Sequence, residues 1–163
     1  MKQAELELFT QNEHLALLCE VPDLSTEDDA SDPLQKEIKR VSHVCNQLSG
    51  VTVIRKGLLD IVSDGERTII VANSGSMKRC GGQGDVLCGT IGTFANYSFR
   101  MGDQSLIDDQ MFQASGKLLS CAIGSITVRE AARQSFLRNG HSLVTPDLLD
   151  SLKADLISQV YSH

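Results

Sequence analysis

Apolar residues in the middle of the chain change from a helical period to short unbroken runs, which predicts a mixed α/β fold. After an Asp-Pro pair at 32–33, the usual start of a helix, apolar side chains recur every three or four residues until Gly50, which we expect to end the helix. Three short β-branched runs follow at 51–55, 59–62 and 68–72, with turn residues between the last two. They predict strands, and the third is expected to be interior because both of its faces are apolar.

The second half of the chain returns to helical spacing. Residues 85–97, 110–137 and 147–161 predict three further helices. The first of these contains Gly89 and Gly92. Glycine inside a helix costs about 1 kcal/mol relative to alanine. We therefore expect these two glycines to mark a close contact with a neighbouring element.

The first thirty residues are less regular. A short apolar run at 6–9 precedes apolar residues at 15–18 with helix-like spacing, and Thr10 or Asn12 would cap the helix that this spacing predicts. Residues 21–33 are acidic and rich in turn-forming residues, so they predict an exposed loop.

Composition narrows the class of protein. A chain of 163 residues with 41% hydrophobic and 22% charged residues is expected to be one soluble globular domain, covering 1–163. No stretch approaches the roughly 18 apolar residues of a membrane span. The five cysteines form no Cys-x-x-Cys pair, which favours reduced thiols over a disulfide framework or a zinc site. We expect a cytoplasmic protein, or a mitochondrial one if a longer precursor carries a targeting signal.

Charge is unevenly distributed along the chain. Residues 1–32 hold one lysine and nine acidic residues, a sum of −8, so the remainder carries +2 of the net −6. A nucleic-acid-binding protein would need a strong basic patch, and we therefore expect neither nucleic acid nor a membrane as partner. The remaining basic residues gather at Arg55–Lys56 and Lys78–Arg79, which suits one small anion better than a phosphate backbone.

The segment Asn73–Gly84, NSGSMKRCGGQG, is the most informative part of the sequence. It follows a predicted strand and opens a predicted helix. Backbone N–H groups there would converge on one spot, where the helix dipole also favours negative charge. Asp85, in the first turn, could take a proton from an attacking hydroxyl. A glycine-rich turn is also an ordinary way to enter a helix, and aspartate is a common cap, so these residues alone indicate anion binding and no more.

Two known motifs, the Walker loop of nucleotide-binding proteins and the nucleophile motif of serine hydrolases, are absent from this segment. No Lys-Ser or Lys-Thr follows its last glycine, as a Walker loop requires, and Ser74 and Ser76 lack a Gly-x-Ser-x-Gly context. A second candidate is Lys56-Gly57-x-x-Asp60, directly after a predicted strand. There the lysine would contact a nucleotide phosphate, although Lys-Gly is also a common end of a strand.

Three segments together resemble the ATP-dependent (S)-NAD(P)H-hydrate dehydratases. They are KGLLD at 56–60, VSDGE at 62–66 and RCGGQGDVLCGT at 79–90, and the resemblance continues through the helical tail at 112–152. It implies a ribokinase-like three-layer α/β/α fold, truncated at the N-terminus in this chain. It also implies an enzyme that uses ATP to restore hydrated NADH or NADPH. The route is thought to be phosphorylation of the ring hydroxyl followed by loss of phosphate.

The resemblance implies roles for individual residues. Asp85 would be the catalytic base and, with Asn12, would contact the substrate. Magnesium would arrive with the nucleotide, because the sequence shows no dedicated ligand cluster. The ATP site would be lined by Lys56, Gly57, Leu58, Leu59, Asp60, Gly75, Ser76, Met77, Lys78, Arg79, Cys80, Gly81, Gly82, Gln83 and Gly84.

The sequence departs from the family pattern at its N-terminal side. Gln11 and Leu15 stand where the family's Thr-Pro-Asn-x-x-Glu segment has Pro and Glu, and the family's catalytic domain extends further in that direction. Two alternatives therefore stay open. One is a non-catalytic nucleotide-binding or regulatory remnant, and the other is a different ribokinase-like small-molecule kinase. The partners expected are small molecules, and homo-oligomers are left open.

Overall fold

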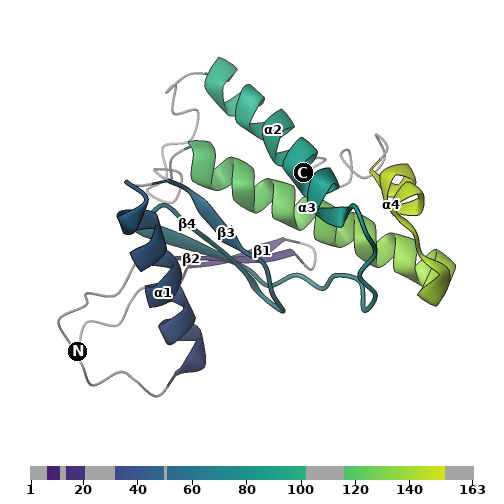
Figure 1. Ribbon diagram of the computed structural model, residues 1–163, viewed down its shortest axis with the longest axis horizontal. Coiled ribbons are helices and arrows are strands. Elements are labelled where there is room, and N and C mark those ends of the chain that lie inside the picture. The colour runs from purple at the N-terminus through teal and green to yellow at the C-terminus, as the bar shows by residue number, and fades with distance from the viewer. Residues whose placement is uncertain (1–6, 12–13, 21–31, 50, 102–115, 153–163) are drawn as a thin grey trace.

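An antiparallel sheet of five strands, in the order β1-β2-β5-β4-β3, separates one helix from the others. The computed structural model describes residues 7–11, 14–20, 32–49, 51–101 and 116–152. Figure 1 shows helix α1 on one side of the sheet and helices α2 and α3 on the other. The elements are β1 (Glu7–Gln11), β2 (His14–Glu20), α1 (Pro33–Gln47), β3 (Val53–Arg55), β4 (Asp60–Ser63), β5 (Arg67–Val71), α2 (Gln83–Met101), α3 (Gly116–Asn139), η3 (Gly140–Ser142) and α4 (Thr145–Ser151).

The two faces of the sheet form two separate cores. Successive residues of β4 and β5 point to opposite faces, so the same two strands supply both cores. The core under α1 contains Ile38, Val41, Cys45, Ile61 and Ile70; the core under α3 contains Val62, Ile69, Val71, Leu118 and Ala122; and a third cluster, between α3 and α4, contains Ala131, Ala132 and Leu148. Asp60 shares the α3 side of β4 with Val62 by this alternation.

The hairpin between β4 and β5 has the predicted turn. Ser63 pairs with Thr68, and the Asp64 carboxylate accepts hydrogen bonds from the backbone N–H groups of Glu66 at 3.0 Å and Arg67 at 2.8 Å. Gly65 has a φ of 99°, which glycine adopts without the steric penalty of a side chain. The prediction that β5 is interior is confirmed, because β5 lies between β2 and β4.

Helix α1 begins as the sequence predicts. The Asp32 side chain accepts a hydrogen bond from the Leu34 backbone N–H at 2.9 Å, and a proline follows at the first helical position. Beyond the helix, Ser49 has a φ of 62°. Gly50, which we expected to end the helix, lies outside the described residues, as do residues 21–31 of the predicted acidic loop.

The helix expected at residues 15–18 is wrong. This segment is strand β2, which pairs with β1 through contacts such as Leu8 to Leu17 and with β5 through Ala16 to Val71. A short apolar run fits the period of a helix as well as that of a strand, and here pairing with two neighbouring strands makes the segment a strand. The later helices differ mainly in their ends: α2 and α4 each begin two residues before the predicted start, and α4 ends at Ser151. Residues 153–161 of the last predicted helix lie outside the described residues.

The glycines that allow close helix packing are not the predicted ones. A Cβ added at Gly89 or Gly92 of α2 would meet nothing within 4 Å, so the expectation of close packing at these residues is wrong. The close approach is at Gly124 of α3, where a Cβ would lie 2.6 Å from Ile91 Cγ1 and 3.3 Å from its Cα. A residue without a side chain is needed where the partner's backbone comes near.

This contrast predicts opposite effects of the same substitution. Gly124→Ala is expected to lower the free energy of unfolding by about 1–3 kcal/mol, because the methyl group would overlap α2. Gly92→Ala is expected to raise it by up to about 1 kcal/mol through helix propensity. Urea unfolding measures both, and equal effects of the two variants would contradict the packing described here.

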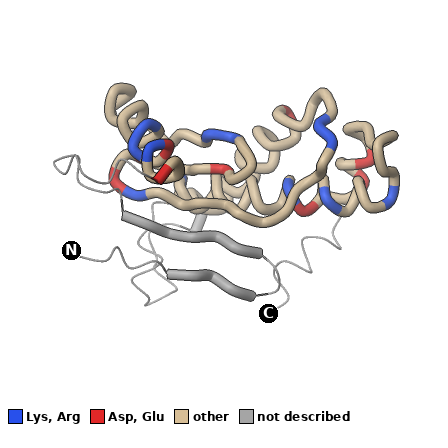
Figure 2. Tube along the Cα trace, turned by 90° about the horizontal axis from the view of Figure 1, so that it is seen from below, with Lys and Arg blue, Asp and Glu red and all other residues tan. Residues whose placement is uncertain are grey.

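The charged residues are mixed along the chain. Figure 2 shows lysine and arginine interspersed with aspartate and glutamate over the described elements. Within the same residues, no helix has the length and apolar character needed to cross a bilayer.

Candidate functional site

One end of the sheet collects both segments that the sequence singled out. Asp60 at the start of β4 pairs with Val71 at the end of β5. The β3–β4 connection, 56–59, and the segment that follows β5, 73–82, therefore leave the sheet side by side. This juxtaposition follows from the antiparallel register alone.

The adjoining ends of β1 and β2, at Gln11 and His14, lie at the same end of the sheet. Ala16 pairs with Val71, and the chain continues from there back to His14, which pairs with Gln11. Asn12, the expected substrate contact, lies outside the described residues. The described residues that flank it in the sequence, Gln11 and His14, belong to this end.

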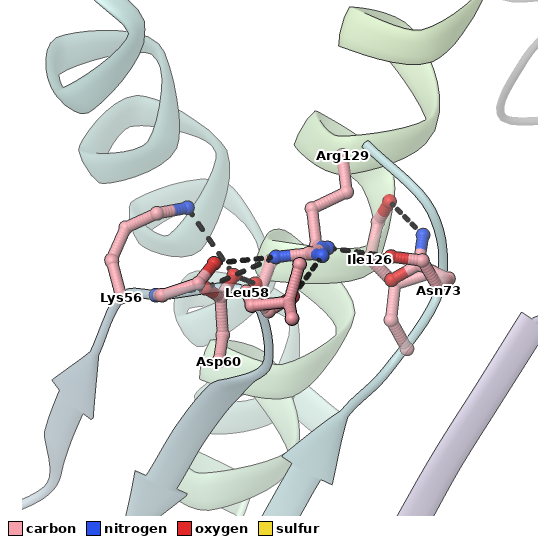
Figure 3. Close-up of polar contacts among 8 residues, drawn as sticks. Lys56, Leu58, Asp60, Asn73, Ile126 and Arg129 are labelled. Atoms are coloured by element: carbon pink, nitrogen blue, oxygen red, sulfur yellow. Dashed lines mark hydrogen bonds and ion pairs between the residues drawn. The ribbon is translucent and has the colours of Figure 1, made fainter. Parts of the chain in front are cut away.

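Asp60 is the buried centre of the site. Its side chain has no exposed surface, and its carboxylate accepts hydrogen bonds from the Ser125 hydroxyl at 2.5 Å and the Gly57 N–H at 2.9 Å. Two cations complete the group: Lys56 Nζ lies 3.3 Å from Oδ2 and Arg129 Nη1 lies 3.2 Å from Oδ1. Figure 3 shows the lysine and the arginine approaching the carboxylate from opposite sides.

The environment of Asp60 favours its charged form. Burial by itself would raise the pKa of this carboxyl group, but the hydrogen bonds from Ser125 and Gly57 and the charges of Lys56 and Arg129 together outweigh it, so the pKa is lowered. Asp60 is therefore ionised at neutral pH. Because the carboxylate has no exposed surface, a ligand cannot reach it in this structure. Its contacts instead hold the β3–β4 connection in place.

Arg129 joins the two segments. Its Nε donates to the carbonyl oxygen of Asn73 at 2.7 Å, and its Nη2 donates to that of Leu58 at 2.6 Å. Its Nη1 also donates to the carbonyl oxygen of Gly57 at 3.4 Å. The arginine side chain is 12% exposed and comes from the middle of α3. One side chain thus connects the start of the β3–β4 loop to the end of β5.

Sequence reasoning missed Ser125 and Arg129. The two residues lie four positions apart and so on one face of α3, but 56 or more residues from the segments that they contact. The signal available in the sequence was an arginine within a run of small and apolar residues. That signal predicts a buried cation, but it does not predict which residues the cation contacts.

The glycine-rich loop ends at the N-terminus of α2. Gly82 has a φ of 87°, and its carbonyl oxygen accepts the Val86 N–H at 3.1 Å, which closes the first turn. The N–H groups before Val86 have no acceptor within the helix, as in any first turn. A Cβ at Gly81 or Gly84 would meet nothing within 4 Å, so the space beside these residues is open to a ligand.

The loop is also held from the C-terminal side of the chain. Lys78 Nζ donates to the carbonyl oxygens of His141 and Leu143, the latter at 3.0 Å. The Thr145 hydroxyl donates to the carbonyl oxygen of Gly81. The Lys78 ammonium group therefore supports the loop in this structure, and a phosphate contact by this residue stays a prediction.

Several predicted site residues point outward. Asp85 and Arg79 are exposed, and the side chains of Leu58 and Met77 are each 89% exposed. Asp85 lies in the first turn of α2, next to the open face of the glycine loop. A carboxylate in this position is accessible to a substrate that is bound across the loop.

Two buried polar atoms of these segments have no hydrogen-bond partner among the described residues. They are Asn73 Oδ1, at the start of the loop, and Gln83 Nε2, at the start of α2. The Asn73 amide group does donate to the Ile126 carbonyl oxygen, at 3.4 Å. Unpaired buried polar groups are costly, and two of them at either end of one loop mark this region as unusual.

Comparison with known proteins identifies the family. A sequence model described as NAD(P)H-hydrate dehydratase matches residues 13–153. The chain belongs to this family. The ribokinase-like α/β fold class expected from the resemblance is confirmed, and the three layers agree with it.

Individual relatives carry the same description. Proteins named ATP-dependent (S)-NAD(P)H-hydrate dehydratase from Arabidopsis thaliana, Mus musculus and Aspergillus fumigatus are similar to this chain, with 31% identity over 140 residues, 36% over 103 and 32% over 171. The matches cover 86%, 63% and 89% of this chain. They cover 34%, 28% and 46% of the relatives, so the chain spans less than half the length of each.

The described residues offer no cage for a metal ion. No group of three His, Cys, Asp or Glu side chains among them is placed to hold one. Both carboxylate oxygens of the buried Asp60 already face hydrogen-bond donors and cations. These residues do not fit a resident Mg²⁺ site.

Proposed function

We propose that this chain binds ATP and carries the catalytic base for the ATP-dependent dehydration of (S)-NADH hydrate and (S)-NADPH hydrate. The reaction restores the reduced coenzymes and releases ADP and phosphate. One observation carries the proposal: in a member of this family, an open glycine-rich loop leads into α2, and Asp85 is exposed in the first turn of that helix. Arg129 joins the start of the same loop to the β3–β4 connection. The names of the relatives support the choice of reaction.

The nucleotide would lie across the two segments. The first-turn N–H groups of α2 suit the phosphate oxygens, because backbone donors and the helix dipole both favour an anion there. The Lys56 side chain is 46% exposed, so it can turn from Asp60 toward a phosphate without any rearrangement of the core. Arg79, exposed within the glycine loop, is a second cation for the same group.

Asp85 would act on the hydroxyl group of the hydrated ring. Its carboxylate would take the hydroxyl proton as the oxygen attacks the γ-phosphorus, and ADP would leave with the electrons of the broken P–O bond. The C–O bond of the phosphate ester then breaks and phosphate departs with the bonding electrons. The neighbouring carbon releases a proton to solvent, and the electrons of its C–H bond form the ring double bond. Magnesium would enter bound to the nucleotide, where it supplies charge to the phosphates.

Thermal unfolding with Mg-ATP tests the nucleotide site. Binding should raise the Tm, with about 2.7 kcal/mol of stabilisation at a ligand concentration 100 times Kd. Gly84→Val should abolish this rise, because its side chain enters the open space beside the loop. Gly92→Val makes the same change in the same helix, also into open space, and should keep the rise. No rise for the unaltered chain would contradict ATP binding.

The non-catalytic alternative has one observation in its favour. Gln11 and Leu15 replace the proline and glutamate of the family pattern at the end of the sheet where the substrate is expected. Recovery of NADH absorbance from the hydrate separates the two functions. Stabilisation by Mg-ATP without such recovery would select nucleotide binding alone.

A further inference from the structure

A single side chain contacts both segments assigned to the nucleotide. Arg129 donates to the carbonyl oxygens of Leu58 and Asn73 at 2.6 and 2.7 Å, and its guanidinium lies 3.2 Å from Asp60. We propose that Arg129 is a positioning residue that holds the two nucleotide-binding segments in one arrangement. Its effect on ATP affinity rests on the function proposed above.

The contacts use the shape of the guanidinium group. Its Nε and both terminal nitrogens each have an oxygen to bind: the Asn73 carbonyl, the Asp60 carboxylate with the Gly57 carbonyl, and the Leu58 carbonyl. A lysine ammonium can keep the ion pair with Asp60. It has no rigid planar fork with which to reach carbonyls on two different segments.

The aliphatic part of Arg129 also packs against the glycine-rich loop. A Cβ built at Gly75 would lie 3.9 Å from the Cβ, Cγ and Nε of the arginine. One turn earlier on α3, the Ile126 carbonyl oxygen accepts a hydrogen bond from the Asn73 amide at 3.4 Å. The first residues of the loop are therefore held against α3 at more than one point.

The helix that carries Arg129 is itself fixed. Leu118 and Ala122 of α3 are buried against the sheet, and Gly124 brings α3 into close contact with α2. Ala131 is buried in the cluster that includes α4. Arg129 thus projects from a rigid element onto two loops, which is the arrangement a positioning residue requires.

Arg129→Lys is the variant that tests the inference, with Arg133→Lys as its matched control. Both make the same change, one helical turn apart, but Arg133 forms its salt bridge with Glu130 on α3 itself. Amide hydrogen exchange is measured at residues 57–59 and 74–75 in the nucleotide-free chain. Mg-ATP affinity, KM and kcat are then measured for both variants.

Arg129→Lys should speed exchange in both segments and weaken Mg-ATP binding by about 10-fold, a typical effect of removing a supporting residue from a site. The kcat at saturating ATP should change little, since Asp85 is untouched. Arg133→Lys should change none of these quantities. Normal exchange, or faster exchange with unaltered ATP affinity, would overturn the inference. Loss of cooperative unfolding in Arg129→Lys would also overturn it, because the residue would then be needed for the fold itself.

The exchange measurement separates this inference from the proposed function. It needs no nucleotide and reports only whether Arg129 orders the two segments. Faster exchange in a chain whose unaltered form binds no Mg-ATP would uphold the ordering by Arg129 and contradict the ATP site. Weaker ATP binding together with faster exchange would support both.

Discussion

Replacing Asp85 by asparagine should lower the rate of NADH recovery by at least about 100-fold, the usual contribution of a positioned general base. Asparagine has nearly the same shape as aspartate but does not accept a proton at neutral pH. Asp85 is exposed in the first turn of α2, so the substitution should disturb the fold little. The loss of a favourable charge at the helix N-terminus costs about 0.3–1 kcal/mol.

Nucleotide binding should survive the same substitution. The phosphate oxygens are assigned to backbone N–H groups and basic side chains, and removing a neighbouring negative charge does not weaken those contacts. The rise in Tm with Mg-ATP is therefore expected to persist in Asp85→Asn while turnover is lost. Glu66→Gln, an exposed acid-to-amide change in the β4–β5 turn, is the control and should retain both properties.

The outcome of this pair of measurements assigns the role of Asp85. Full activity in Asp85→Asn would exclude the residue as the base. Loss of the Mg-ATP effect together with activity would place it in the nucleotide site and leave the base unassigned.

Asp60→Ala is expected to lower the free energy of unfolding by about 3–5 kcal/mol, the range for removing one partner of a buried ion pair. The cost arises mainly at Arg129, whose side chain is only 12% exposed and whose guanidinium would be left without its carboxylate partner. Lys56, at 46% exposure, can return to water. Lys56→Met should therefore cost about 1 kcal/mol or less. Urea unfolding checks both values, and similar costs for the two variants would contradict the burial argument.

The dependence of stability on pH gives a second readout for Asp60. Its pKa is lowered in the folded chain, so its ionised form stabilises the fold. That contribution is complete above the unfolded-state pKa of about 3.9 and is lost as pH falls through the folded-state value. The gap in unfolding free energy between the unaltered chain and Asp60→Asn should therefore narrow below about pH 4. A constant gap would mean that the carboxylate gains nothing from its surroundings.

Local signals in the sequence predicted much of the fold. The Asp-Pro start of α1, the β-branched strands and the turn at Gly65 each depend on neighbouring residues, and the structure has all three. The spacing of the apolar residues at 15–18 resembles that of a helix, and only pairing with β1 and β5 makes this segment a strand.

The candidate site also has parts that the sequence predicts and parts that it does not. The glycine-rich loop and its helix could be found from their composition. The groups that hold Asp60 and the loop could not, because Ser125, Arg129 and Thr145 are distant in sequence from the residues they contact. The structural role of a glycine in a helix also depends on which element packs against it. Gly124 permits a close approach between helices, whereas Gly92 of α2 faces open space.

The ion pair at Asp60 also has a consequence for synthesis on the ribosome. Asp60 and the strands around it emerge well before α3, since Ser125 follows Asp60 by 65 residues. At 5–20 residues per second, this interval lasts about 3–13 s. During it, the nascent sheet has a charged group on the face that α3 later covers. The buried contacts of Asp60 with Ser125 and Arg129 can therefore form only after α3 has been synthesised, whereas Lys56 is available from the start.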